Sequence, residues 1–243
     1  ISTANDRSPN AHGICLEILS VAEYIENTGL IYSVENGISL FSSEVKDIIN
    51  TGVTYGGSYG INQASRNTLA HIINTGVIYG RLFAVRNGGG TIAFLDNYGI
   101  LVAERSSIME GSTTNPPTNY GLHLTGTDGK VTVDAGKASN DPTEIITGYN
   151  ENGKPIKRNL VIKNAELNGL SGAATSTQSI EVKDSENKYD NFVLNGKNET
   201  IKVSGVNNKI TGSIINAYGT AVVFDTAGGE IALSGTIVNG GID

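Results

Sequence analysis

A short motif repeats at nearly constant spacing through the first half of the chain. Its clearest copy is Ile-Ile-Asn-Thr-Gly-Val-Ile-Tyr-Gly at residues 72–80, and related copies occupy residues 48–56 and 25–33. The asparagines of five copies, which are 23, 24, 23 and 22 residues apart, are Asn27, Asn50, Asn74, Asn97 and Asn119. A fixed period of this kind is typical of stacked repeats. Because the motif is β-prone and no helical periodicity accompanies it, we predict an all-β parallel β-helix with about 22–24 residues per coil.

The asparagine and glycine of each copy are expected at a turn between strands. Both residue types adopt a positive φ at lower cost than other residues. Asparagines stacked at one turn can also join their side-chain amides into a ladder along the coil axis. The strands of neighbouring coils then pair their backbone groups with the coils above and below. We therefore predict a structural role for all five asparagines.

Composition and charge narrow the classes of protein. The 243 residues include no Trp, one Met and one Cys. Stacked repeats need few large anchors, because each coil packs mainly on its neighbours. The net charge of −7 argues against nucleic acid as a partner, and against docking on anionic lipid. The single Cys15 excludes an internal disulfide, and its apolar neighbours predict a small buried hydrophobe.

We predict an N-terminal cap over residues 1–20 and a parallel β-helix over residues 21–243. An excursion of loops and a hairpin is expected at about residues 110–159. Within it, Asn152-Gly153 stands between two apolar runs, a strong indication of a hairpin turn. Degraded repeats follow at residues 212–216 and 235–239, and the chain ends soon after, as expected for a part of a longer protein.

The strand after each repeat asparagine is apolar on both faces. In one alternation, the inward residues are Ile31, Thr54, Ile78, Leu101 and His123. The outward columns are then Leu30, Val53, Val77, Ile100 and Leu122, beside Tyr32, Tyr55, Tyr79, Val102 and Leu124. The opposite alternation exposes Ile31, Ile78 and Leu101 instead. A doubly apolar strand is normally covered on both faces, here by a loop of the chain, a second copy or a receptor. The candidate interface residues are Tyr32, Val53, Tyr55, Val77 and Tyr79, with Tyr149, Glu151 and Lys154 of the hairpin.

Motifs for catalysis or metal binding are weak. Residues 56–60 match the G-x-S-x-G nucleophile pattern, but no helix is expected after them, as that motif requires. Asp184, Glu186 and Asp190 form an acidic cluster that we interpret as a solvated loop, with Ca²⁺ binding or catalysis as the alternatives. No His or Cys spacing suits a metal. We expect no catalytic residue, metal or cofactor.

The repeats resemble those of autotransporter passenger domains, the type V secreted proteins of Gram-negative bacteria. That family carries degenerate I-x-N-x-G-x-I-x-G repeats, matched here by Ile72, Asn74, Gly76, Ile78 and Gly80. The resemblance is good over residues 21–124, fair over 160–239 and poor over 125–159. It implies a right-handed parallel β-helix on the bacterial cell surface, outside the cell. It also implies an outer-membrane barrel that follows the passenger at the C-terminus.

By resemblance, the chain is expected to be a non-enzymatic adhesin that attaches to host receptors or to other cells. The partners implied are an immunoglobulin-like adhesion receptor, a surface glycan or a second copy of the chain. A self-associating structural passenger is a further reading. The alternative from another class is a carbohydrate-active β-helix enzyme, a polysaccharide hydrolase or lyase that uses paired carboxylates.

Overall fold

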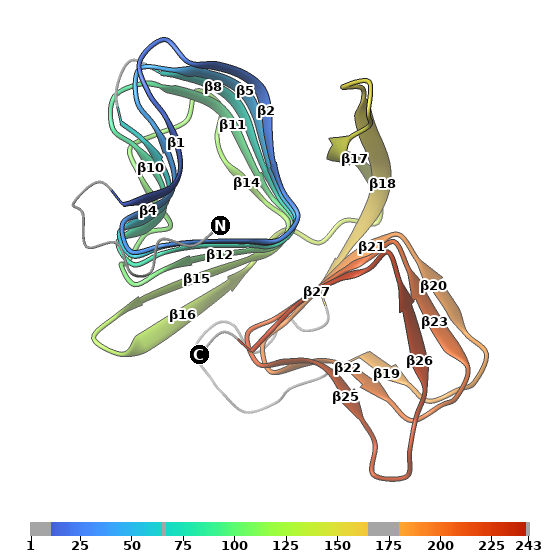
Figure 1. Ribbon diagram of the computed structural model, residues 1–243. Coiled ribbons are helices and arrows are strands. Elements are labelled where there is room, and N and C mark those ends of the chain that lie inside the picture. Colours follow the sequence, from blue (N-terminus) through green and yellow to red (C-terminus); the bar gives the residue numbers. More distant parts are fainter. Residues whose placement is uncertain (1–10, 65–66, 165–179, 242–243) are drawn as a thin grey trace. The chain divides into compact units, whose positions relative to one another are not determined.

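The computed structural model describes residues 11–64, 67–164 and 180–241, and these form strands and turns throughout (Figure 1). The described ranges contain 27 strands and no helix, and so no helix there is long and apolar enough to span a membrane. Most neighbouring strands are parallel and stack as a β-solenoid of about nine turns. The predicted all-β parallel β-helix is therefore confirmed. The chain divides into two compact units, residues 1–118 with 123–132, and residues 119–122 with 133–243.

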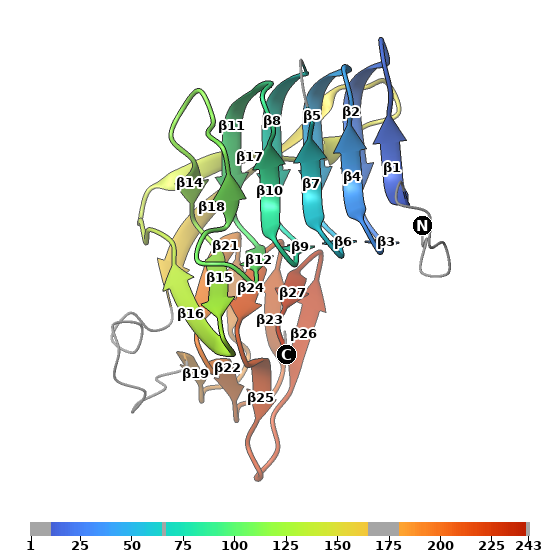
Figure 2. The same cartoon turned by 90° about the vertical axis from the view of Figure 1, so that its left-hand side faces the viewer.

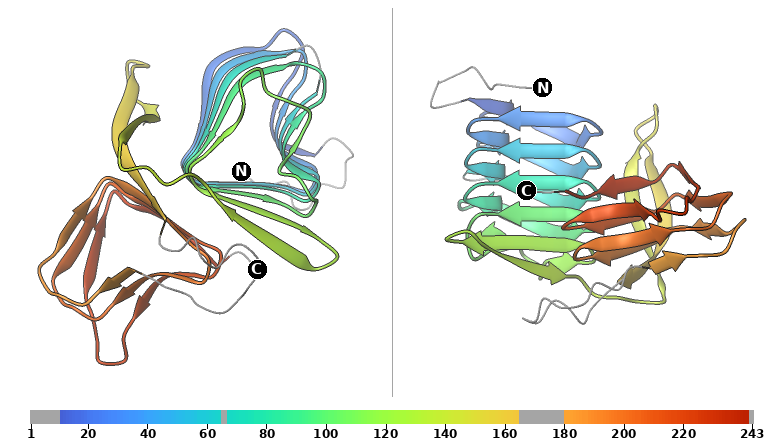
Figure 3. Two further views of the ribbon diagram at one scale, coloured as in Figure 1. Left: turned by 180° about the vertical axis from the view of Figure 1, so that it is seen from behind. Right: turned by 90° about the horizontal axis from the view of Figure 1, so that it is seen from below.

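Sheets 1, 2 and 3 form the first unit, except that residues 119, 122 and 133–135 of their last strands fall in the second unit. Each coil contributes one strand to each sheet, and sheet 3 has one further strand at its edge (Figures 2 and 3). Sheet 1 has the order β1 (His12–Leu16), β4 (Asn36–Leu40), β7 (Tyr59–Gln63), β10 (Phe83–Asn87) and β13 (Met109–Glu110). Sheet 2 has the order β2 (Val21–Asn27), β5 (Glu44–Asn50), β8 (Thr68–Asn74), β11 (Thr91–Asn97) and β14 (Thr118–Asn119). Sheet 3 has the order β3 (Leu30–Ser33), β6 (Val53–Gly56), β9 (Val77–Gly80), β12 (Ile100–Ala103), β15 (Leu122–Thr127) and β16 (Lys130–Ala135).

Sheets 4, 5 and 6 form the second unit in the same way. Sheet 4 has the order β17 (Pro142–Tyr149), β18 (Pro155–Asn164), β21 (Phe192–Gly196), β24 (Ile214–Ala217) and β27 (Ile237–Asn239). Sheet 5 has the order β19 (Ile180–Val182), β22 (Glu199–Val203) and β25 (Thr220–Phe224). Sheet 6 has the order β20 (Lys188–Asp190), β23 (Asn208–Thr211) and β26 (Ile231–Ser234).

The predicted hairpin is formed by β17 and β18, which pair in the antiparallel sense. Its turn is closed by Asn150, whose carbonyl accepts from the Gly153 N–H, and Gly153 has a φ of 70°. The second arm also pairs in parallel with β21, so residues 161–164 belong to the stack of the second unit.

Four of the five repeat asparagines, Asn27, Asn50, Asn74 and Asn97, lie in register inside the coils of the first unit and are almost completely buried, whereas Asn119 is half-buried. Asn27 Nδ2 donates to Asn50 Oδ1 at 2.8 Å, Asn50 Nδ2 donates to Asn74 Oδ1 at 2.8 Å, and Asn74 Nδ2 donates to Asn97 Oδ1 at 2.7 Å. These bonds form an amide ladder along the coil axis. Because a buried polar group without a partner is costly, each rung depends on the rungs beside it.

The second unit contains its own amide ladder. Asn195 Nδ2 donates to Asn164 Oδ1 at 2.9 Å, Asn216 Nδ2 donates to Asn195 Oδ1 at 2.8 Å, and Asn239 Nδ2 donates to Asn216 Oδ1 at 2.8 Å. Each amide here donates toward the N-terminus of the chain, whereas in the first unit each donates toward the C-terminus.

The expected reason for the repeat glycines is wrong. Gly29, Gly52, Gly76 and Gly99 have no positive φ. Instead, a Cβ atom on Gly52 would lie 2.0 Å from the Gly29 carbonyl oxygen, and one on Gly76 would lie 2.0 Å from the Gly52 carbonyl oxygen. Gly52, Gly76 and Gly99 are therefore required because each turn approaches the preceding turn too closely for a side chain, whereas a Cβ atom on Gly29 would meet nothing within 4 Å.

The prediction that Cys15 is buried is also wrong, since its side chain is exposed. On β1 the flanking Ile14 and Leu16 pack against the core, so the residue between them points outward. Residues 11–20 of the predicted cap contain this strand, which pairs in parallel with β4. Residues 1–10 of the cap lie outside the described ranges.

We predict that Asn50→Ala destabilises the first unit by about 1–3 kcal/mol, because it removes both ladder bonds of Asn50. The buried Asn74 Oδ1 loses its Asn50 donor, whereas Asn27 Nδ2 keeps its bond to the Val53 carbonyl. Urea unfolding followed by circular dichroism measures the change. Ser106→Ala, at an exposed loop position, is the control and should change the unfolding free energy by less than about 0.5 kcal/mol. Equal stability of the two variants would show that the ladder contributes little.

Candidate functional site

Sheet 3 follows the first of the two alternations considered from the sequence. Ile31, Thr54, Ile78 and Leu101 point into the coil and are at most 3% exposed. His123, expected inward with them, is half-buried on β15. The residues before and after each inward position therefore point away from the core of the coil.

Two columns of outward side chains run across the first three strands of this sheet. We call these six residues the tyrosine strip: Leu30, Tyr32, Val53, Tyr55, Val77 and Tyr79. Leu30 is 55% exposed, Val53 is 38% exposed, and the other four are half-buried. The matching outward residues of the last rows are buried within the chain: Ile100, Val102, Leu122 and Leu124. The apolar outer face is therefore accessible only over β3, β6 and β9.

The three rings of the tyrosine strip stack almost in parallel. The ring centroids of Tyr32 and Tyr55 are 4.6 Å apart at an angle of 7°, and those of Tyr55 and Tyr79 are 4.5 Å apart at 3°. The in-register parallel strands place the same residue at the same height in each coil, which brings the rings into contact. The strip is therefore a rigid aromatic surface before any partner binds.

Burial favours the protonated form of Tyr55 and Tyr79. The Tyr79 hydroxyl donates to the exposed carboxylate of Glu104. Burial, and then this hydrogen bond, raise the pKa of Tyr79 well above its ordinary value. Burial and the neighbouring Tyr32 raise the pKa of Tyr55 as well. At Tyr55 and Tyr79 the surface therefore presents uncharged hydroxyl groups on an apolar base.

The other candidate interface residues lie at the β17–β18 hairpin of the second unit. Tyr149 is half-buried, and Glu151 and Lys154 are exposed in the turn. The Lys154 N–H donates to Asn150 Oδ1 at 2.9 Å, which orders the turn. Since these residues and the tyrosine strip belong to different compact units, the structure does not combine them into one site.

The residues of the weak catalytic motifs lie in turns and on the surface of the solenoid. Ser58, in the G-x-S-x-G match, lies in the turn between β6 and β7, and its Oγ donates to Glu35 Oε2 at 3.1 Å. A strand therefore follows this serine, where a nucleophile elbow has a helix. Asp184, Glu186 and Asp190 are all exposed. Among the described residues, no group of three His, Cys, Asp or Glu side chains is placed to hold a metal ion.

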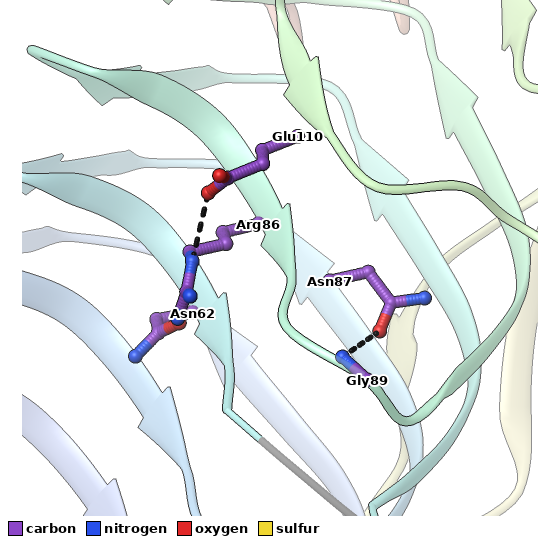
Figure 4. Close-up of polar contacts among 5 residues, drawn as sticks. All are labelled: Asn62, Arg86, Asn87, Gly89 and Glu110. Carbon is purple, nitrogen blue, oxygen red and sulfur yellow. Dashed lines mark hydrogen bonds and ion pairs between the residues drawn. The ribbon is translucent and has the colours of Figure 1, made fainter.

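A polar cluster on the outer face of sheet 1 was missed in the sequence (Figure 4). Arg86 on β10 donates from Nε to Glu110 Oε2 at 2.8 Å and from Nη1 to Asn62 Oδ1 at 3.2 Å. These three residues lie at one register position on adjacent strands, 24 residues apart. The spacing could have indicated the cluster, but the three residue types differ, so no repeated letter marks it.

The raised pKa of Tyr79 predicts a dependence of stability on pH. An unfolded tyrosine loses its proton near pH 10, whereas the folded Tyr79 keeps its proton, so stability should fall as the pH rises above 10. Titration of tyrosinate absorbance, compared between the parent and Tyr79→Phe, isolates this residue. The titration step that the parent shows and Tyr79→Phe lacks should lie above pH 10. A step at or below pH 10 would contradict the described burial and hydrogen bond of Tyr79.

Comparison with known proteins assigns no family to this chain. Searches against protein-family models, curated proteins and solved structures gave no match. The β-solenoid fold is compatible with binding proteins and with enzymes, so fold alone does not assign an activity. The tyrosine strip and the polar cluster of sheet 1 are the candidate functional surfaces of the described residues.

Proposed function

We propose that this chain is the passenger region of a bacterial cell-surface adhesin that attaches to host receptors or to other cells. The observation that carries the proposal is the tyrosine strip, a rigid aromatic surface on the outside of a coil. Isolated apolar residues are common on protein surfaces, but an ordered apolar strip is typical of interaction sites. The proposal also draws on the resemblance of the repeats to autotransporter passengers.

The chemistry of the strip suits protein recognition. Tyrosine is enriched at interfaces, because it offers a large apolar ring and a polar tip. The stacked rings of Tyr32, Tyr55 and Tyr79 have already lost rotamer freedom, so binding costs less side-chain entropy. Because Leu30 is 55% and Val53 is 38% exposed, burying the remainder would contribute about 0.5–1.5 kcal/mol each before the costs of association.

The proposed partner is an exposed apolar surface on another protein, such as an immunoglobulin-like adhesion receptor of the host or a second copy of this chain. The outer face of the same sheet is already buried within the chain at Ile100 and Leu122. Its accessible rows carry the same kinds of residue and would be covered in the same way by a partner. The proposed location is the bacterial cell surface, with the chain attached to an outer-membrane anchor.

We predict that Val53→Asp and Val77→Asp each weaken binding of the purified chain to cultured epithelial cells, or its self-association, by about tenfold or more. Placing an unpaired carboxylate in an apolar interface costs more than one decade of affinity. Flow cytometry of labelled protein measures cell binding, and analytical ultracentrifugation measures self-association. Because both valines point away from the coil interior, the circular dichroism of the variants should match that of the parent.

Val206→Asp is the matched control, since it introduces the same charge at an exposed valine in a turn of the second unit. It should bind and self-associate like the parent. Folded Val53→Asp and Val77→Asp variants that behave like this control would show that the strip is not an interface. Release of soluble saccharides from a polysaccharide panel by the parent would instead support the carbohydrate-active enzyme.

A further inference from the structure

We propose that the outer face of sheet 1 carries a binding site for a neutral saccharide, built around Arg86. This inference deepens the proposed function, because it rests on the chain being a binding module and assigns a ligand class to a second surface. The site consists of Tyr59, Asn62, Phe83, Arg86 and Glu110. All five lie on β7, β10 and β13 of the first unit.

Arg86 is held in one orientation by three contacts. Its guanidinium carbon lies 5.1 Å from the centre of the Tyr59 ring, and its Nε and Nη1 atoms donate to Glu110 and Asn62. The same Nη1 atom would be only 3.0 Å from a Cβ atom on Gly88, so glycine at that position leaves room for the guanidinium. A fixed guanidinium loses little entropy when a ligand binds.

The Arg86 guanidinium has more N–H donors than its described hydrogen bonds use, and the side chain is partly exposed to solvent. A guanidinium has five N–H donors, and two of them make the described bonds. The Arg86 side chain is 31% exposed and that of Glu110 is 46% exposed. The carboxylate of Glu110 uses only Oε2 toward Arg86. Donors and acceptors therefore stand side by side, an arrangement that matches hydroxyl groups, which both donate and accept.

Charge selects a neutral ligand over an acidic one. Glu110 neutralises Arg86 and would repel a carboxylate, sulfate or phosphate placed beside the guanidinium. An anion site instead leaves its arginine unpaired, so that a bidentate pair can form with the ligand. The paired charges point to a ligand that carries hydroxyl groups and no net charge.

Aromatic rings supply the apolar part of the site. The rings of Tyr59 and Phe83 are half-buried, with centroids 6.5 Å apart and planes 12° apart. The exposed parts of these rings can contact the C–H groups of a pyranose ring while the polar groups contact its hydroxyls. At the end of β10, Asn87 Oδ1 accepts from the Gly89 N–H group (Figure 4) and from the Gly90 N–H group. Gly88 and Gly89 are exposed, so no side chain rises from this edge of the site.

If the cluster has only a structural role, substitution of Arg86 or Glu110 should change saccharide binding little. An exposed ion pair such as Arg86–Glu110 contributes little to stability, so its removal should leave the fold intact. Saccharide binding is the readout that separates the two roles.

The test uses an array of immobilised neutral, sialylated and sulfated oligosaccharides, probed with the purified chain. We expect binding to members of the neutral set, with little dependence on salt concentration. Arg86→Gln and Glu110→Gln should each weaken that binding by about tenfold or more. Arg105→Gln, at an exposed arginine outside the cluster, is the control and should bind like the parent.

Three results would overturn the proposal: no bound glycan, binding restricted to acidic glycans, or undiminished binding by folded Arg86→Gln and Glu110→Gln variants. If the parent binds no array glycan but still binds cells through the tyrosine strip, this inference fails while the proposed function stands. If the parent binds neutral glycans and also cleaves them, the saccharide site stands and the proposed non-enzymatic function fails.

Discussion

The in-register stacking of buried asparagines is the constraint on which the rest of the structure depends. Each Asn amide in the first unit donates to the next coil, from Asn27 to Asn97. A shift of one residue in any strand would separate these partners and move apolar side chains to the wrong face. Gly52 and Gly76 reinforce the same register, because the preceding turn leaves no space for a side chain.

Functional surfaces follow from this register. Because the coils stack in register, a residue type that recurs at the repeat period forms a column on the outer surface. One such column consists of Tyr32, Tyr55 and Tyr79. A column can also combine different residues, as with Asn62, Arg86 and Glu110, whose side chains bond across three strands. The solenoid thus converts spacing along the chain into ordered surfaces, and their chemistry supports binding of an apolar protein surface and of a neutral saccharide.

The sequence predicted the features that repeat and missed those that depend on neighbours in space. The repeat period and the apolar alternation around Ile78 could be predicted from the sequence, because stacking requires the same residue class at the same position of each coil. The rung at Asn195 was missed, since its surroundings have lost the motif. Cys15 was placed inside because its neighbours are apolar, whereas its own position on β1 points outward. The close approach at Gly52 is set by another coil and leaves no local mark.

Hydrogen exchange of the asparagine carboxamides, followed by NMR, tests the account most directly. The Nδ2 hydrogens of Asn50 and Asn74 are buried and bonded to the next coil, so they exchange only when the stack opens. Our account predicts that they are strongly protected and that they exchange together with the backbone amides of the same coils. Exchange as fast as that of the exposed Asn152 carboxamide would contradict the amide ladder as the element that holds the coils in register.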